Sequence, residues 1–378
     1  MTIRTLMFFL LTSVYSLTAY ASEDSRSINQ TMTDIGSVMV KTFPTIVAKK
    51  KLEPSEEKAL HEAVKKLSQL FIQIKPQILQ RSDTYQISYD LVLDYLENIN
   101  RKFNRNDVES ARRALYSLGA ICTSCHTQDT QSRTIFPGVG RQSFDSDLSY
   151  ADFNYMTRDY NRAVKYYDKH LRSGSQKTEL ELVQTMQRLI TVYTQIYNTP
   201  GVAAKQLSEY KTLNGHTEKT KKHLNGWIQG LKKLKSSGVS NSDKTSFKKL
   251  KQYVKKYIGN TDQAAAEIFS TAEDEVARVW LRGQLFHYLN SNPPKEEIPV
   301  ILYWLSICDR SVGYNYNFSL ADLYLKQCIK SHAKHPYAKK CFSEYQAFIE
   351  IMYSGSAGIF IPPELEDELI ELRSIIEP

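Results

Sequence analysis

Residues 122–126 read Cys-Thr-Ser-Cys-His, the C-x-x-C-H pattern that attaches c-type haem. Two thiols three positions apart on a helical turn can each add to one of the two vinyl groups of the same porphyrin, and the adjoining imidazole then lies under the iron. This chemistry assigns Cys122 and Cys125 to covalent thioether bonds with one haem, and His126 to the proximal iron position.

Two other kinds of site use the same residue types: half of a zinc site and a thioredoxin-like dithiol. Zinc needs two further ligands, and the nearest histidines, His61 and His170, each stand alone in a helical stretch. A reactive dithiol places its cysteine at a helix N-terminus, where the helix dipole lowers the thiol pKa. Because this pair comes at the end of a helical pattern, the sequence favours haem.

Residues 1–21 have the composition of a secretory signal peptide. Arg4 supplies the positive start, residues 6–17 are apolar, and Ala19-Tyr20-Ala21 is a small-x-small cleavage site, so cleavage is expected after Ala21. The apolar run is too short to cross a bilayer, which needs about 20 residues. Haem is attached to apocytochromes outside the cytoplasm, so the export signal and the haem motif support each other. We expect a periplasmic protein with no integral membrane span.

Four helical patterns can position the haem motif. Apolar residues recur at three- and four-residue steps from Ser27 to Val47, from Pro54 to Pro76, from Asp83 through Ile99, and from Asn106 through Cys122. Asn106 and Glu109 are predicted to form a capping box at the start of the fourth pattern. Each helix can bury one apolar stripe, and short polar links join neighbours. We therefore expect an antiparallel four-helix bundle within residues 23–135.

A four-helix pattern after an export signal, with C-x-x-C-H on the last helix and a methionine on the first, resembles the cytochrome c′ and cytochrome c-556 family. In that family the first helix often carries a Met-x-x-x-Gly-x-x-Met segment, which Met32, Gly36 and Met39 match. The resemblance implies that Met32 takes the position of the sixth iron ligand of low-spin members, although an ordinary core methionine is the plain alternative. After His126 the sequence departs from the family, because residues 127–130 contain no basic residue before Arg133. The family's propionate contacts are therefore not carried over.

The remainder of the chain is predicted to be helical as well, which makes the protein all-α. Residues 136–147 are predicted to be a linker, and residues 148–378 show helical patterns without a strand-like run. Two segments, 151–171 and 320–352, are similar to the helix pairs of tetratricopeptide (TPR) repeats. We expect a TPR-like or other α-solenoid region that ends in an amphipathic helix after Pro363.

Three further cysteines are Cys308, Cys328 and Cys341. In an oxidising compartment two of them are expected to be bridged. Cys328 and Cys341 flank the turn of a predicted helical hairpin around Pro336, so this pair is favoured and Cys308 is left as a buried thiol. Pairing of Cys308 with either of the others stays open.

Positive charge is concentrated in one stretch. The formal charge is +8, and fourteen lysines lie between Lys205 and Lys256 against three acidic residues. Export argues against a nucleic-acid partner, which leaves an acidic protein partner, an anionic membrane surface, or simply solvated helix faces.

These features predict an exported monohaem c-type cytochrome that carries single electrons, more an electron-transfer protein than an enzyme. The helical region would dock an acidic redox partner. The family resemblance implies one alternative, a five-coordinate haem protein that binds or senses NO or CO, and it is compatible with a homodimer. A periplasmic interaction scaffold with a structural haem is the third possibility.

Overall fold

The computed structural model describes residues 27–47, 51–81, 83–126, 140–175, 177–213, 216–238, 246–259, 271–312, 320–356 and 358–377. The predicted signal peptide, residues 1–21, lies outside these ranges. The described residues are helical apart from connections and one antiparallel pair of two-residue strands, β1 (Ser354–Gly355) and β2 (Gly358–Ile359). This confirms the predicted all-α class. Within the described ranges, no helix combines the length and the apolar character needed to span a membrane.

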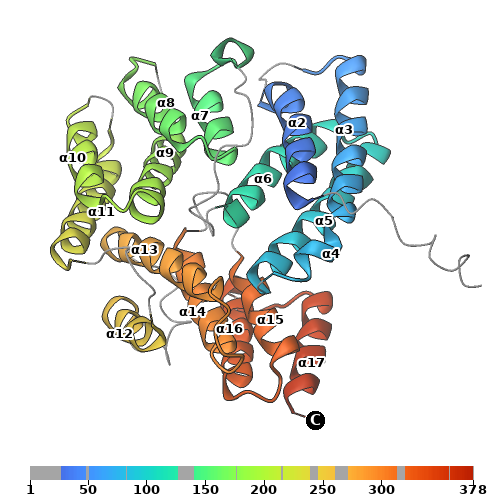
Figure 1. Ribbon diagram of the computed structural model, residues 1–378, viewed down its shortest axis with the longest axis vertical. Coiled ribbons are helices and arrows are strands. Elements are labelled where there is room, and N and C mark those ends of the chain that lie inside the picture. Colours follow the sequence, from blue (N-terminus) through green and yellow to red (C-terminus); the bar gives the residue numbers. More distant parts are fainter. Residues whose placement is uncertain are drawn as a thin grey trace, which may run out of the picture.

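The first four long helices pack around one apolar core. They are α2 (Ile28–Val47), α3 (Pro54–Gln73), α5 (Asp83–Asn104) and α6 (Val108–His126), and the one-turn helix α4 (Lys75–Ile78) joins α3 to α5. Helix α2 packs against α3, α3 against α5, α5 against α6, and α6 returns to α2 (Figure 1). Each helix buries one stripe, for example Phe43 of α2, Leu67 of α3, Leu96 of α5 and Leu115 of α6.

The start of α6 differs from the prediction. Asn106 has a φ of 58°, and Asp107 caps the helix instead, because its Oδ1 accepts the N–H of Ser110 at 3.3 Å. Glu109 pairs with Arg112 at 2.8 Å. The predicted capping box of Asn106 and Glu109 was wrong because the left-handed turn at Asn106, a conformation that asparagine tolerates, moves the cap one residue on.

The remaining helices form a curved row that returns to the first group (Figure 1). Helix α15 packs against α5, which closes the row. The elements in order are the 3-10 turn η1 (Arg141–Ser143), α7 (Asp147–Met156), α8 (Tyr160–Arg172), α9 (Glu179–Thr191), the π-helical turn η2 (Val192–Ile196), α10 (Pro200–Lys211), α11 (Glu218–Ser236), α12 (Phe247–Tyr257), α13 (Ala272–Leu289), α14 (Ile298–Val312), α15 (Ala321–Ser331), α16 (Pro336–Met352) and α17 (Pro363–Ile376).

Helix α7 contributes to two cores. Tyr150, Phe153 and Met156 are buried in the core of the first helices, whereas Ala151 and Tyr155 belong to the core of the later helices. The segment just before α7 is packed too, since the buried ring of Phe144 lies 5.3 Å from the ring of Phe153, measured between centroids. The division into residues 23–135, 136–147 and 148–378 stays a prediction.

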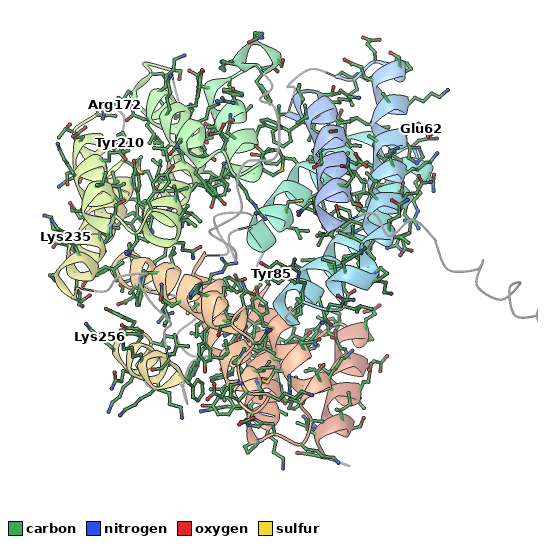
Figure 2. The ribbon with its side chains drawn as sticks, in the orientation of Figure 1. Glu62, Tyr85, Arg172, Tyr210, Lys235 and Lys256 are labelled. Carbon is green, nitrogen blue, oxygen red and sulfur yellow. A yellow bond between two sulfur atoms is a disulfide. The ribbon has the colours of Figure 1, made fainter. Side chains whose placement is uncertain are left out.

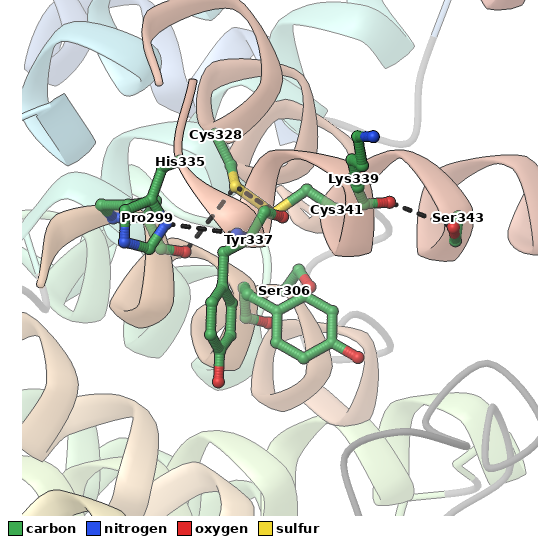
Figure 3. Close-up of a disulfide and its surroundings, with 9 residues drawn as sticks. Pro299, Ser306, Cys328, His335, Tyr337, Lys339, Cys341 and Ser343 are labelled. Carbon is green, nitrogen blue, oxygen red and sulfur yellow. Dashed lines mark hydrogen bonds between the residues drawn. A yellow bond between two sulfur atoms is a disulfide. The ribbon is translucent and has the colours of Figure 1, made fainter. Parts of the chain in front are cut away.

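A disulfide joins Cys328 of α15 to Cys341 of α16, with Cα atoms 6.4 Å apart (Figure 3). It spans the turn around Pro336 and is the pair that the sequence favoured. Cys308 lies fully buried on α14, where burial raises the thiol pKa to about 12. The thiol of Cys308 is therefore neutral and inert at physiological pH.

Candidate functional site

Helix α6 carries the C-x-x-C-H residues at its C-terminal end. Ala111, Leu115 and Leu118 are buried on one stripe, and Cys122 continues this stripe as a half-buried residue. Cys125 and His126 belong to the last turn of α6, and positions three and four apart share one helix face. The described part of the structure does not include the side chains of Cys125 and His126, so their predicted roles stay predictions.

Cys122 lines an apolar pocket together with Met32, Gly36 and Met39 of α2. These three residues are the matched positions of the Met-x-x-x-Gly-x-x-Met segment, and steps of four and three residues place them on one face of α2. Gly36 and Met39 are buried and Met32 is half-buried. The fold thus brings the predicted sixth iron ligand and one predicted thioether cysteine to the same pocket.

Helix α5 also lines the pocket, with Tyr85, Ser88, Tyr89 and Val92 at helical spacing. Tyr85 lies near the centre of the molecule (Figure 2). The hydroxyl of Tyr89 is buried and has no hydrogen-bond partner among the described residues. Burial and the charge of Asp90 raise the pKa of Tyr89, so the hydroxyl stays protonated and can donate.

Sequence reasoning missed two parts of this lining. It recognised one apolar pattern between Asp83 and Ile99, whereas residues 85, 88, 89 and 92 form a second stripe that the same spacing rule could have found. It also placed the haem-binding bundle within residues 23–135. Met156 and Thr157, at the end of α7, lie beyond that boundary and line the pocket as well.

The lining suits a haem by its chemistry. Cys122 offers a thiol, Met32 a soft thioether, and Ile35, Gly36 and Val92 offer apolar walls. The unpartnered hydroxyl of Tyr89 offers a donor for a polar substituent. The open space is about 70 Å³, smaller than a porphyrin, so binding requires lining side chains to move. Methionine is the most adaptable of the apolar side chains, and three of them line the space.

The two histidines considered as further zinc ligands, His61 and His170, do not line the pocket of Cys122. His61 stacks on Phe103 with ring centroids 4.9 Å apart. Among the described residues, no group of three or more His, Cys, Asp and Glu side chains could hold a metal ion.

The lysine-rich stretch forms α11 and α12. In α12 the inward face consists of Leu250 and Val254, and the exposed face carries five lysines: Lys248, Lys249, Lys251, Lys255 and Lys256. In α11 some lysines pair with acidic residues, for example Lys233 with Glu273 at 3.2 Å. Lys235 and Lys256 lie on the side of the molecule away from α2–α6 (Figure 2).

A scan against protein-family models found no match to this chain, and searches of curated proteins and of solved structures found no significant match either. The function of the chain is therefore inferred from its residues and its pocket.

Proposed function

We propose that this protein is an exported, periplasmic c-type cytochrome with one covalent haem that carries single electrons. The observation that carries the proposal is the shared pocket: Cys122 of the C-x-x-C-H motif and Met32 of the Met-x-x-x-Gly-x-x-Met segment line the same apolar space. The family resemblance predicts this meeting, because it assigns Met32 and Cys122 to the same haem.

We also propose a fold type for each of the two groups of helices. Helices α2, α3, α5 and α6 would be a cytochrome c′-type four-helix bundle, which is supported by their shared apolar core and by the packing of α6 on both α5 and α2. The later helices would be a TPR-like α-solenoid, which is supported by the packing of α7 on α8 and of α15 on α16 within the two segments with TPR-like sequence.

Each residue of the site has a separate task. Cys122 and Cys125 would hold the porphyrin through thioether bonds, and His126 and Met32 would be the ligands of its iron. A haem with His and Met ligands supplies one-electron transfer at a raised potential. The apolar residues Ile35 and Val92 exclude water from the pocket. Tyr89 would donate its buried hydroxyl to a polar substituent of the bound group.

Partner recognition would use a different part of the molecule. The exposed lysines of α12 would attract an acidic redox partner and set its orientation through long-range charge. Because α12 lies away from α2–α6, recognition and electron transfer would use separate faces (Figure 1).

The test is spectroscopic. The full-length protein is expressed with its signal in a host that attaches haem c, and absorption and EPR spectra are recorded in ferric and dithionite-reduced states, with and without CO. The proposal predicts covalent haem and a low-spin spectrum unchanged by CO. Met32→Ala should give a high-spin, CO-sensitive spectrum, whereas Met39→Leu, which nearly conserves volume, should stay low-spin. Absence of covalent haem would refute the cytochrome assignment.

A five-coordinate haem protein that binds NO or CO is the second candidate. The apolar lining of the pocket favours it, because a neutral diatomic molecule enters apolar space at little cost. In that case the wild-type protein would already be high-spin and respond to CO, and Met32→Ala would change neither property.

A further inference from the structure

A second, larger cavity of about 840 Å³ lies between the first helices and the later ones. Its walls come from the end of α2, the middle of α6, the start of α7, the end of α8 with the residues that follow it, and α9. It shares no described lining residue with the pocket of Cys122. The proposed haem chemistry therefore makes no use of it.

The floor of this cavity is a buried polar network. Asp152 of α7 pairs with Arg188 of α9 and accepts hydrogen bonds from the hydroxyls of Tyr116 and Tyr167, each at 2.9 Å. Asp152 and Arg188 are each only 8% exposed. The charge of Asp152 and burial raise the pKa of Tyr116 to about 12, so this hydroxyl remains a donor. The carboxylate of Asp152 is therefore satisfied by the protein.

The other two lining carboxylates are satisfied as well. Asp147 accepts from Arg141 at 2.5 Å and from Lys169 at 3.1 Å. Glu181 accepts the backbone N–H of Thr178 at 2.8 Å in the capping box of α9. Since all three carboxylates already have partners in the protein, the cavity is not expected to favour a cationic ligand.

The lining cations differ in this respect. Arg188 pairs with Asp152 and Arg112 with Glu109, whereas Arg113 has no acidic partner among the described residues. Arg113 is an exposed residue whose guanidinium donates to the hydroxyl of Ser110 at 2.9 Å, which leaves its other N–H donors to water or to a ligand. A planar guanidinium with free donors matches a carboxylate in both charge and shape.

Two further features of the cavity indicate what else a ligand would contact. The Nε2 atom of His170 is buried in the wall without a hydrogen-bond partner among the described residues. Burial and the nearby charge of Lys177 lower the pKa of His170, so the ring is neutral at physiological pH and supplies one polar contact rather than a charge. Ile46, Val47 and Leu148 contribute apolar surface to the same cavity.

We propose that this cavity binds a small organic carboxylate with a partly apolar body, whose carboxylate is held by Arg113. The imidazole of His170 makes a second polar contact, and the apolar residues at the end of α2 and the start of α7 cover the body of the ligand. The proposed site shares no described lining residue with the pocket of Cys122, so the carboxylate proposal and the haem proposal can each be refuted without the other.

The test compares two probes of nearly equal shape, 3-phenylpropionate and its uncharged amide, 3-phenylpropionamide. Binding to the full-length protein is measured by isothermal titration and by saturation-transfer NMR. The carboxylate should bind and the amide should bind at least about tenfold more weakly, as expected for the loss of a charge-assisted hydrogen bond. Arg113→Gln should weaken carboxylate binding about tenfold, and His170→Ala should weaken it to a smaller extent.

Arg101→Gln is the matched control, because Arg101 is an exposed arginine of α5 that pairs with Glu97 and does not line the cavity. It should leave the affinity unchanged. Circular dichroism confirms that the variants fold. No detectable carboxylate binding, equal binding of acid and amide, or equal affinities of wild type and Arg113→Gln would each overturn the proposal.

Discussion

Glu275 provides a direct test of the fold, because it is a buried carboxyl whose two hydrogen-bond donors, Gln187 and Trp227, are both neutral. It lies on α13, is 7% exposed, and accepts hydrogen bonds from Gln187 Nε2 at 2.6 Å and from Trp227 Nε1 at 2.8 Å. Burial raises the pKa of the carboxyl from 4.5 to about 7, although both hydrogen bonds act in the opposite direction. The loss of hydration of the charged form is thus larger than the gain from two neutral donors.

The raised pKa makes stability depend on pH in a defined direction. Between pH 4.5 and about 7 the folded chain keeps a proton on Glu275 that the unfolded chain has released, so the free energy of unfolding falls as pH rises. The stabilisation that comes from the protonated carboxyl of Glu275 is fully present below pH 4.5 and is lost above about pH 7. One pKa unit is worth about 1.4 kcal/mol, so the total change is about 3 kcal/mol.

The assay is urea unfolding of wild type and Glu275→Gln at pH 4.5 and pH 8, followed by circular dichroism and tryptophan fluorescence. The new amide can accept from Trp227, and Gln187 can turn its amide, because its Oε1 has no hydrogen-bond partner among the described residues. We expect the stability of Glu275→Gln relative to wild type to rise by about 3 kcal/mol between the two pH values.

Glu273→Gln is the control for this experiment, since Glu273 is a more exposed carboxyl on the same helix, paired with Lys233. It should show no comparable rise. A stability difference between Glu275→Gln and wild type that is the same at both pH values would refute the argument from burial.

Three further predictions concern stability. Asp152→Asn should lower the free energy of unfolding, measured in urea, by about 3–5 kcal/mol, because it leaves the buried Arg188 without its carboxylate partner. If Asp152→Asn destabilises the fold no more than Tyr116→Phe does, the buried ion pair is not as important as we expect. Gly230→Ala should lower the melting temperature, although alanine has the better helix propensity, because the new Cβ would lie 2.5 Å from the backbone carbonyl oxygen of Glu273. Gln229→Ala is the control: Gln229 is exposed, and its replacement should not lower the melting temperature. Replacing Cys328 and Cys341 together by serine should lower the free energy of unfolding by about 3 kcal/mol and make it insensitive to reductant, whereas a variant that still responds to reductant would argue against this disulfide.

Local features of the fold could be predicted from the sequence because they depend on neighbours in the chain. The apolar steps from Ser27 to Val47 predicted α2, which the structure assigns to Ile28–Val47. The pair Cys328 and Cys341 could be predicted because both cysteines flank one turn. The meeting of Met32 with Cys122 followed from the family resemblance rather than from spacing, since it requires α2 and α6 to pack together.

Features that depend on contacts between distant helices could not be predicted in this way. Gly226 and Gly230, one turn apart on α11, allow close approach of α13, and the sequence gives no indication of which helix approaches. Buried charged residues cannot be predicted from the sequence for a related reason. A charged residue in a helical pattern is assigned to the exposed face, whereas the Arg282–Asp309 pair is 4% exposed on both side chains and becomes visible only when α13 and α14 are packed.

Helix α7 connects the pocket of Cys122 to the buried polar network of the second cavity. At its C-terminal end, Met156 lines the pocket of Cys122 and fills the space over Gly119 of α6, where a Cβ would lie 2.9 Å from its Sδ. On the preceding turn, Asp152 accepts the hydroxyl of Tyr116 from α6 and pairs with Arg188 from α9. Moving α7 away from α6 would open the pocket and would also remove one donor from a buried carboxylate, which costs more than losing an exposed contact. A group that enters the pocket of Cys122 and displaces Met156 therefore has one of two effects. Either the side chain of Met156 changes its conformation while α7 stays in place, or α7 moves and the hydrogen bonds of Asp152 in the second cavity change with it.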